Sequence, residues 1–319
     1  MKIFRDLAQL PEFNNAVLTI GSFDGVHPGH RHIIRVMQQS AEALNGETVL
    51  ITFYPHPRIA LAEQNGQITS LKLLCDLDEK ATLLDQCGLD NLVVVPFTKE
   101  FSEQSPDDYI ERFLVKYFKP AVIVIGYDHR FGKGRTGDIE YLKKFQSKYS
   151  FQLLEISKHE VDGIAVSSTK IRNALQSGDV AHAEKMLGYY YTLSGTVIHG
   201  LHLGRKLGFP TANIAVADTE KLIPEDGIYA VVVNIGLKKY KGMLYIGSRP
   251  SVDTGFGKTI EVNIFDFSED IYGQKIKVEF IDFIRADIKF DNLPELSAQL
   301  EKDMISAKTI LINIETVAP

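Results

Sequence analysis

Several features are scarce in this chain of 319 residues: it has no tryptophan, only two cysteines and no long apolar run. The two thiols, Cys75 and Cys87, are too few for a disulfide framework, and residues 1–6 lack the apolar core of a secretory signal. No stretch approaches the ~20 consecutive apolar residues that a transmembrane helix needs. We therefore expect a cytoplasmic protein that has no membrane partner.

Positive charge is also in short supply, since 35 Lys and Arg residues face 41 Asp and Glu residues, a formal net charge of −6. This balance argues against a protein that binds nucleic acid by bulk electrostatics. A small anionic ligand is still compatible, because a phosphate pocket needs only a few local donors. Hydrophobic residues make up 45% of the chain, and its length predicts two domains of roughly 150 residues each.

The first half of the chain alternates short apolar runs with segments of helical spacing. Runs rich in Val, Ile and Phe predict buried strands at 16–20, 49–53, 92–95, 121–125 and 151–156. Between them, apolar residues recur at helical spacing, and Ser105-Pro106 has the form of a helix start. This alternation predicts a doubly wound α/β domain with a mostly parallel, Rossmann-like sheet. Such sheets bind ligands beyond the carboxyl ends of their strands.

The pattern changes after Gly188. Short Gly-rich turns there separate predicted strands at 189–198, 227–235, 240–246, 259–267 and 275–284. Several strands with short connections predict an antiparallel barrel or sandwich, and residues 293–306 predict a terminal helix. We place the domain boundary after a helical stretch, which gives domains at 1–186 and 187–319.

The strongest local signal is G-S-F-D-G-V-H-P-G-H at residues 21–30, directly after the first of these predicted strands. Gly21 and Gly29 permit close approach of a ligand to the backbone, and the helix that follows offers free N–H groups to an anion. His27 and His30 lie three residues apart and can both donate to a phosphate on which charge grows. The plainer alternative is a Gly-rich turn with two surface histidines. The whole string in a strand–turn–helix setting favours the phosphate site.

A second signal of this kind is V-S-S-T-K-I-R at residues 166–172, which opens another predicted helix. With Lys170 and Arg172 in its first turns, this helix end suits a polyphosphate, whose oxygens Arg172 can bind with a bidentate fork. Helix capping is the alternative role for the serines. Capping does not explain the positive charges of Lys170 and Arg172, because the N-terminal end of a helix, where its dipole is positive, disfavours cations.

Two further loops follow predicted strands. G-Y-D-H-R-F-G-K-G-R at residues 126–135 mixes aromatic, basic and glycine residues, which suits a flat ring beside a phosphate. A flexible basic loop is the alternative. The prolines of T-F-Y-P-H-P at residues 52–57 predict a rigid loop in which His56 is at most a wall of a pocket.

In the second half, the main signal is G-R-K-L-G-F-P-T-A-N at residues 204–213. In an extended chain, Thr211 and Asn213 point to the same side, and their oxygens suit Mg²⁺. Alternation along the strand at 259–267 places Glu261 opposite the apolar face, where a carboxylate can accept the proton of an attacking hydroxyl. The alternatives are a Gly/Pro loop and a solvent-facing glutamate.

Together these motifs resemble a known family. G-x-F-D-G-x-H-x-G-H with the downstream S-S-T-x-I-R is similar to the nucleotidyltransferase superfamily and, more closely, to the FMN adenylyltransferase module of prokaryotic bifunctional riboflavin kinase/FAD synthetases. P-T-A-N, with I-P-E-D-G-I-Y-A at 223–230, G-S-R-P at 247–250 and I-E-V at 260–262, resembles the riboflavin kinase module, which is a barrel. The two resemblances cover about residues 14–306.

The resemblance implies that ATP phosphorylates riboflavin to FMN in the barrel and that a second ATP adenylylates FMN to FAD in the first domain. Glu261 is then the base of the kinase, and Thr211 and Asn213 hold Mg²⁺ and phosphates. His27 and His30 are the catalytic groups at the α-phosphate in the first domain. Mg²⁺ is expected in both sites.

The same resemblance implies further site residues. Arg172 joins the catalytic set, and Asp128 and His56 contact the flavin. The implied nucleotide-binding residues are Gly21, Phe23, Asp24, Gly29, Ser168, Thr169, Gly204, Lys206, Gly208 and Pro210. Two positions depart from the common pattern of the family: His129 replaces an aromatic residue, and Asn263 replaces a histidine.

Other functions stay open at this point. One is a nucleotidyltransferase with a different small substrate, whose barrel only binds a ligand. Another is a flavin or nucleotide sensor that turns nothing over. An RNA-binding barrel is disfavoured, because the chain is acidic and shows no basic, aromatic strand face. The oligomeric state does not follow from the sequence.

Overall fold

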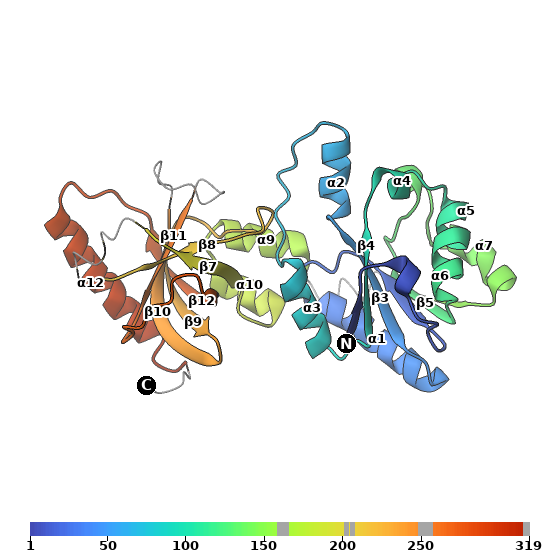
Figure 1. Ribbon diagram of the computed structural model, residues 1–319, viewed down its shortest axis with the longest axis horizontal. Coiled ribbons are helices and arrows are strands. Elements are labelled where there is room, and N and C mark those ends of the chain that lie inside the picture. The colour runs from blue at the N-terminus through green and yellow to red at the C-terminus, as the bar shows by residue number, and fades with distance from the viewer. Residues whose placement is uncertain (158–165, 201–203, 205–207, 248–257, 315–319) are drawn as a thin grey trace. The chain divides into compact units, whose positions relative to one another are not determined.

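The computed structural model describes residues 1–157, 166–200, 204, 208–247 and 258–314 (Figure 1). The chain forms two compact units, 1–167 and 168–319. The helices α9 (Ser168–Gln176) and α10 (Val180–Leu187) belong to the second unit, because α10 packs against its strands and the Leu175 carbonyl accepts from Glu225 N. We predicted a domain boundary after residue 186, whereas the two compact units divide after residue 167. The boundary between the two functional domains stays a prediction.

The first unit is built on a six-stranded parallel sheet in the order β1-β4-β3-β2-β5-β6. Its strands are β1 (Lys2–Phe4), β2 (Val17–Ile20), β3 (Thr48–Tyr54), β4 (Asn91–Pro96), β5 (Val122–Gly126) and β6 (Gln152–Ile156). The five predicted strands of this half are confirmed. The edge strand β1 was missed, because three residues are too few to show a period.

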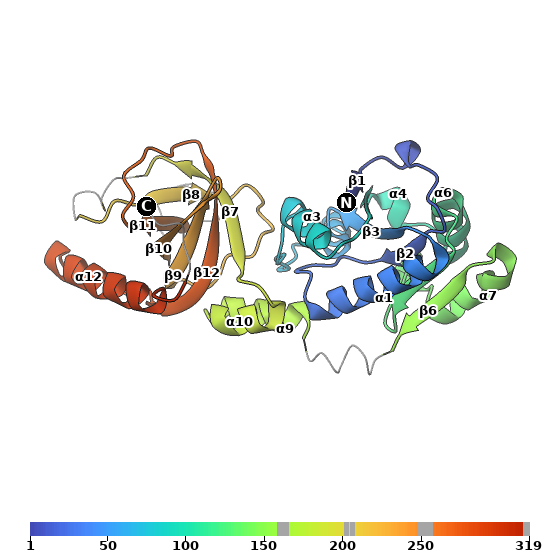
Figure 2. The same ribbon diagram turned by 90° about the horizontal axis from the view of Figure 1, so that it is seen from below.

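Helices cover both faces of this sheet (Figure 2). One face carries α1 (Pro28–Leu44) and α3 (Leu77–Gln86), whose apolar side chains share a core with β2. The other carries α7 (Ile139–Tyr149) and a continuous helical run from α5 (Pro106–Asp108) through a π-helical stretch (Tyr109–Val115) to α6 (Lys116–Phe118). Two short helices, α2 (Pro57–Gln64) and α4 (Lys99–Ser102), follow β3 and β4.

The strand order reverses direction between β2 and β5, since β3 and β4 lie on one side of this pair and β6 on the other. The backbone pairing of β2 with β5 covers Val17 and Leu18, and the Thr19 hydroxyl then donates to the Val124 carbonyl at 2.8 Å. Doubly wound sheets bind ligands in the crevice at the carboxyl ends of such a reversal. The fold thus directs attention to the loops that follow β2 and β5.

The second unit is a closed antiparallel barrel in the order β10-β11-β8-β7-β12-β9, in which no edge strand remains. Its strands are β7 (Thr192–Ile198), β8 (Ala212–Ala215), β9 (Gly227–Ile235), β10 (Lys238–Gly247), β11 (Thr259–Ile264) and β12 (Lys275–Ala286). The terminal helix α12 (Leu293–Ile310) packs against β9, β10 and β12. The predicted α/β fold, barrel and terminal helix are confirmed. In the part of the chain that the structure describes, no helix is long and apolar enough to cross a membrane.

Candidate functional site

The loop after β2 enters α1 through a strained backbone. Phe23 and Val26 have positive φ angles of 45° and 36°, which non-glycine residues adopt at a cost of about 1–3 kcal/mol each. Helix α1 then begins at Pro28, with His27 at the capping position. The predicted strand–turn–helix is therefore present at the reversal point of the sheet, where a ligand site is expected.

The two histidines of this loop lie face to face. The ring centroids of His27 and His30 are 3.8 Å apart with 17° between the planes, and the Phe23 ring lies 4.7 Å from that of His30. The space beside these rings is tight, because a Cβ on Gly21 would meet the Phe23 ring at 3.0 Å and one on Gly29 would meet His27 at 3.2 Å. The structure thus brings together the motif residues that the sequence analysis selected.

Burial lowers the pKa of His30 well below its usual value, and the nearby charges of His27 and Lys80 lower it further. The imidazole of His30 is therefore neutral at pH 7 and has one N–H to donate. Its Nδ1 atom is buried and has no hydrogen-bond partner among the described residues. A buried polar atom of this kind points to a ligand that completes it.

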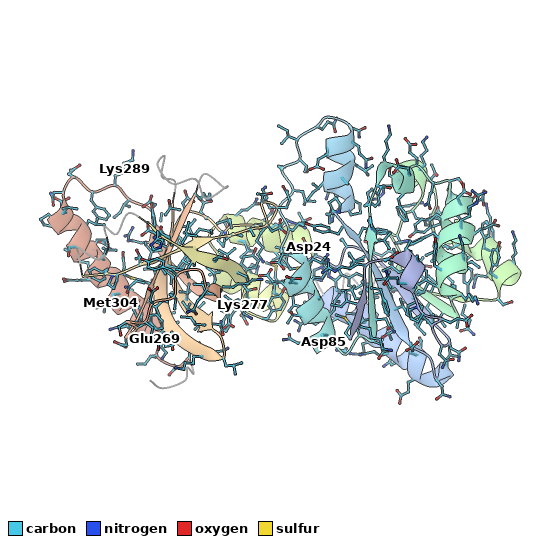
Figure 3. All side chains as sticks on the ribbon, viewed as in Figure 1. Asp24, Asp85, Glu269, Lys277, Lys289 and Met304 are labelled. Atoms are coloured by element: carbon cyan, nitrogen blue, oxygen red, sulfur yellow. The ribbon has the colours of Figure 1, made fainter. Side chains whose placement is uncertain are left out.

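The buried carboxylate of Asp24 holds a distant segment against this loop. It accepts hydrogen bonds from Leu74 N at 2.9 Å and from Cys75 N at 3.2 Å, while Gly25 N donates to the Cys75 thiol. Figure 3 labels Asp24 among the side chains of the first unit. Residues 74 and 75 lead into α3, which carries Lys80. The expected contact of Asp24 with a nucleotide stays a prediction, and the structure gives this residue a positioning role that the sequence did not suggest.

The loop after β5 places His129 inward and Asp128 outward. His129 stacks on the buried ring of Phe131, with centroids 6.0 Å apart, and its Nε2 atom is buried without a hydrogen-bond partner in the described part of the chain. Burial lowers the pKa of His129 to about 4. Asp128 is exposed, and the Nδ1 atom of His56 accepts from Arg58 N at the start of α2. The flavin contacts of Asp128 and His56 stay predictions.

Ser168, Thr169 and Arg172 lie in the first two turns of α9, which belongs to the second unit. Thr169 is exposed, and Ser168 and Arg172 are partly buried. Their convergence with the histidine pair stays a prediction, as does a contact of Lys206, which lies outside the described residues.

In the barrel, strand register brings the second set of candidate residues together. Asn213 on β8 pairs with Glu261 on β11, and Glu261 pairs in turn with Tyr245 on β10. Paired residues point to the same face of a sheet, so these three side chains form a row. The Thr211 hydroxyl donates to Glu261 Oε2 at 2.9 Å.

The P-T-A-N segment is fixed by its surroundings. Asn263 donates from its amide to the Pro210 carbonyl at 2.6 Å. A Cβ on Gly200 would meet the Asn213 amide at 2.1 Å, and one on Gly204 would meet the Phe209 carbonyl oxygen at 2.2 Å. Only glycine fits at these positions, and the backbone next to the metal-ligand candidates is left bare. Gly208 has a φ of +82°, a conformation that glycine adopts readily.

A cavity of about 310 Å³ opens beside this row. One part of its wall is polar and includes Thr211, Glu261 and Asn263. Another part is apolar and comes from α12 and the segment before it, with the side chains of Ile288, Phe290, Leu293, Leu296 and Leu300. An apolar slot with a few convergent polar groups is the usual form of a small-molecule site.

Comparison with known proteins matches both units. The family model for FAD synthetase matches residues 10–170, and that for riboflavin kinase matches residues 187–311. Bifunctional riboflavin kinase/FMN adenylyltransferases are 36% identical in Escherichia coli K12, over 97% of each chain, and 36% identical in Listeria monocytogenes, over 94% of each chain. The chain belongs to the bifunctional riboflavin kinase/FMN adenylyltransferase family. The resemblance that the motifs predicted is thereby confirmed.

A solved structure supports the same fold. A crystal structure described as that of a macrolide-efflux protein from Streptococcus pneumoniae is 30% identical, with a TM-score of 0.83, and covers 96% of this chain and 98% of its own. The Haemophilus influenzae member of the bifunctional family is 37% identical over 91% of this chain and 92% of its own. The activities of this family are riboflavin kinase and FMN adenylyltransferase.

The carboxylate of Asp24 provides a first test. In Asp24→Asn only the amide oxygen can accept hydrogen bonds from Leu74 N and Cys75 N, because the amide nitrogen is a donor. We expect the free energy of unfolding to fall by about 1–3 kcal/mol. FMN adenylylation should fall roughly 10- to 100-fold as the loop loses its geometry. Steady-state rates measure this, with the exposed Asp78→Asn on α3 as the matched control. Wild-type adenylylation in Asp24→Asn would contradict the positioning role.

The depressed pKa of His129 predicts a dependence of stability on pH. As pH falls below about 6.5, the unfolded chain takes up a proton that the folded chain accepts only near pH 4, so stability is lost over this range. Between pH 7 and pH 5 the variant His129→Asn should lose roughly 1–2 kcal/mol less than the wild type. Denaturant unfolding at the two pH values measures the difference. Equal losses in both proteins would contradict a neutral, buried His129.

Proposed function

We propose a division of the two activities between two separate sites in the chain. The barrel phosphorylates the 5′-hydroxyl of riboflavin with ATP, and the site after β2 then joins FMN to AMP from a second ATP and releases pyrophosphate. The observation that carries this division is the Thr211–Glu261 hydrogen bond beside an amphipathic cavity in one unit. The stacked His27–His30 pair in the other unit supports it.

In the kinase site, Glu261 is the base. Its Oε2 atom accepts from the Thr211 hydroxyl, which fixes the carboxylate at the wall of the cavity, where it accepts the proton of the riboflavin 5′-hydroxyl. The apolar wall from α12 suits the ring system of the flavin, and the polar wall suits its hydroxylated chain. Proton acceptance and alignment are the contributions of the protein to this step.

The donors beside Glu261 fit a magnesium ion. The Thr211 hydroxyl and the Asn213 amide oxygen are hard ligands that would hold the ion, and phosphate and water oxygens would supply its other ligands. The Thr211 hydroxyl is hydrogen-bonded to Glu261, and Asn213 pairs with Glu261 in the strand register, so these donors lie together. When bound, the ion neutralises charge on the ATP phosphates. Gly204, Gly208, Pro210 and Lys206 are the proposed contacts of the nucleotide.

In the adenylylation site, the phosphate of FMN is already a nucleophile, so no covalent intermediate and no strong base are needed. His27 and the neutral His30 donate hydrogen bonds to the α-phosphate as its charge grows. They lie at the N-terminal end of α1, where the helix dipole is positive. Gly21, Phe23 and Gly29 form the wall against the nucleotide. The proposed contacts of the β- and γ-phosphates are Ser168, Thr169 and Arg172, and Asp128 and His56 are the proposed contacts of the flavin.

A cytoplasmic setting is part of the proposal. It is supported by Cys75 and Cys87, neither of which is in a disulfide in the described structure, since cysteines stay reduced in that compartment.

Reciprocal substitutions test the division. Glu261→Gln should lower FMN formation from riboflavin by about 100-fold or more, while FAD formation from supplied FMN stays within about twofold of wild type. His30→Ala should do the reverse, so that FMN accumulates and FAD formation falls by roughly 100- to 1,000-fold. Chromatographic separation of riboflavin, FMN and FAD over time measures both reactions in one sample.

Each variant serves as the folding control of the other, because its second activity reports an intact chain. Undiminished FMN formation in Glu261→Gln would contradict the role of Glu261 and favour a barrel that only binds a ligand. Loss of both activities in either folded variant would contradict two separate sites.

A further inference from the structure

A charged residue interrupts the apolar stripe of the terminal helix. Leu293, Leu296 and Leu300 of α12 line the cavity, and Ala307 lies in the core that α12 shares with the barrel. Asp303 falls on the same face of the helix at helical spacing and is only 1% exposed. A buried carboxylate in such a stripe is costly unless it is paired and hydrogen-bonded.

Asp303 is paired with Arg285, at the end of strand β12. Arg285 donates from Nε to Asp303 Oδ1 at 2.9 Å and from Nη2 to Asp303 Oδ2 at 2.7 Å. This is the bidentate geometry in which arginine and a carboxylate fix each other's orientation. Gln299, one turn earlier on α12, donates to Asp303 Oδ1 at 2.8 Å. The carboxylate thus joins the barrel to the helix that forms the cavity wall.

Each nitrogen of the Arg285 guanidinium donates a hydrogen bond within the protein. Its Nη1 atom donates to the Ala286 carbonyl at 2.9 Å, and the ring of Phe290 lies 5.9 Å from its Cζ atom. All three of its nitrogens therefore have protein partners, although Arg285 borders the cavity. This arrangement suits a group that holds the wall and does not suit a group that binds a substrate phosphate.

The segment that follows Arg285 is also hydrogen-bonded to strand β10. The Tyr245 hydroxyl, on β10, donates to Asp287 Oδ2 at 3.1 Å. Phe290 lies three residues further on and contributes an aromatic wall. Residues 285–290 are therefore fixed to α12 at one point and to β10 at another, and β10 also carries the neighbour of Glu261 in the strand register.

We propose that the Arg285–Asp303 ion pair is a positioning device for the kinase reaction: it holds α12 and Phe290 at the distance that makes the cavity fit a flavin ring. The inference rests on the proposed function of the barrel. Neither residue touches the reacting atoms. Buried ion pairs add little net stability compared with apolar residues of the same size, so geometry is the property that this pair supplies.

Asp303→Asn tests the proposal in the full chain. The amide keeps the shape of the carboxylate but not its charge or its second acceptor. We expect the KM for riboflavin to rise tenfold or more, while kcat changes less than threefold and the KM for ATP stays at the wild-type value. FAD formation from supplied FMN should be unchanged, which reports an intact chain. Lys302→Ala, an exposed neighbour on α12, is the matched control and should keep the wild-type KM for riboflavin.

Two further variants separate positioning from stability. Arg285→Lys keeps a charge but loses the fork, and we expect an intermediate KM for riboflavin. The double variant Arg285→Met with Asp303→Leu replaces the pair by apolar side chains, which should preserve the melting temperature. Its KM for riboflavin should stay high, because the bidentate constraint is gone. If Asp303→Asn does not fold, these two variants test the positioning role of the ion pair in its place.

The outcomes distinguish this inference from the function on which it rests. If the wild type forms FMN and Asp303→Asn keeps the wild-type KM for riboflavin, the positioning role is overturned and the proposed function stands. A double variant that regains both stability and the wild-type KM overturns it as well, because the pair then serves stability alone. If the wild type forms no FMN from riboflavin, it is the proposed function that fails.

Discussion

The hydrogen-bond register of the strands is the constraint on which both sites depend. In the first unit, the pairing of β2 with β5 places the loops after these strands at the reversal point of the sheet. In the second unit, the pairing of β8 with β11 sets Asn213 opposite Glu261. A slip of one residue would turn the side chains of a strand to the other face. The chemistry is therefore set by backbone pairing before any ligand is bound.

Buried polar contacts between distant segments then refine what the register provides. Asp24 binds the backbone at residues 74 and 75, and Asp303 binds Arg285 at the end of β12. Both carboxylates lie in surroundings where an unpaired charge is costly, so their partners cannot move away cheaply. The Asp24 contact joins the histidine loop to the segment before α3, and the Asp303 contact joins α12, which lines the cavity, to the end of β12.

Much of this arrangement follows from local sequence. Val/Ile-rich runs predicted the central strands, and Ser105 caps its helix as its position before Pro106 indicated. The two-residue period of a strand predicted that Thr211 and Asn213 point to one side and that Glu261 lies opposite the apolar face. In the structure Thr211 is hydrogen-bonded to Glu261. These features depend on neighbours within a few positions, where sequence patterns are informative.

Other features depend on partners far along the chain and carry no local signal. Asp24 was interpreted as a nucleotide contact because it lies in the motif, and that contact stays a prediction. Its hydrogen bonds to Leu74 and Cys75, 50 and 51 positions away, had no local signal. The charge of Lys80, on α3, helps to lower the pKa of His30, and nothing in the segment around Lys80 indicates this. The buried pairing of Asp303 could have been predicted from the sequence, because a carboxylate at helical spacing among leucines needs a buried partner. Its identity as Arg285 required the fold.

The central claim, that each reaction has its own complete site, is tested most directly by mixing two variant chains, each of which lacks one of the two activities. The variants Glu261→Gln and His30→Ala are combined in equal amounts with riboflavin, ATP and Mg²⁺, and FAD is followed over time. The account predicts that the mixture forms FAD although neither variant does so alone, because one chain supplies FMN and the other adenylylates it. A mixture that accumulates FMN and forms no FAD, with both chains folded, would contradict it.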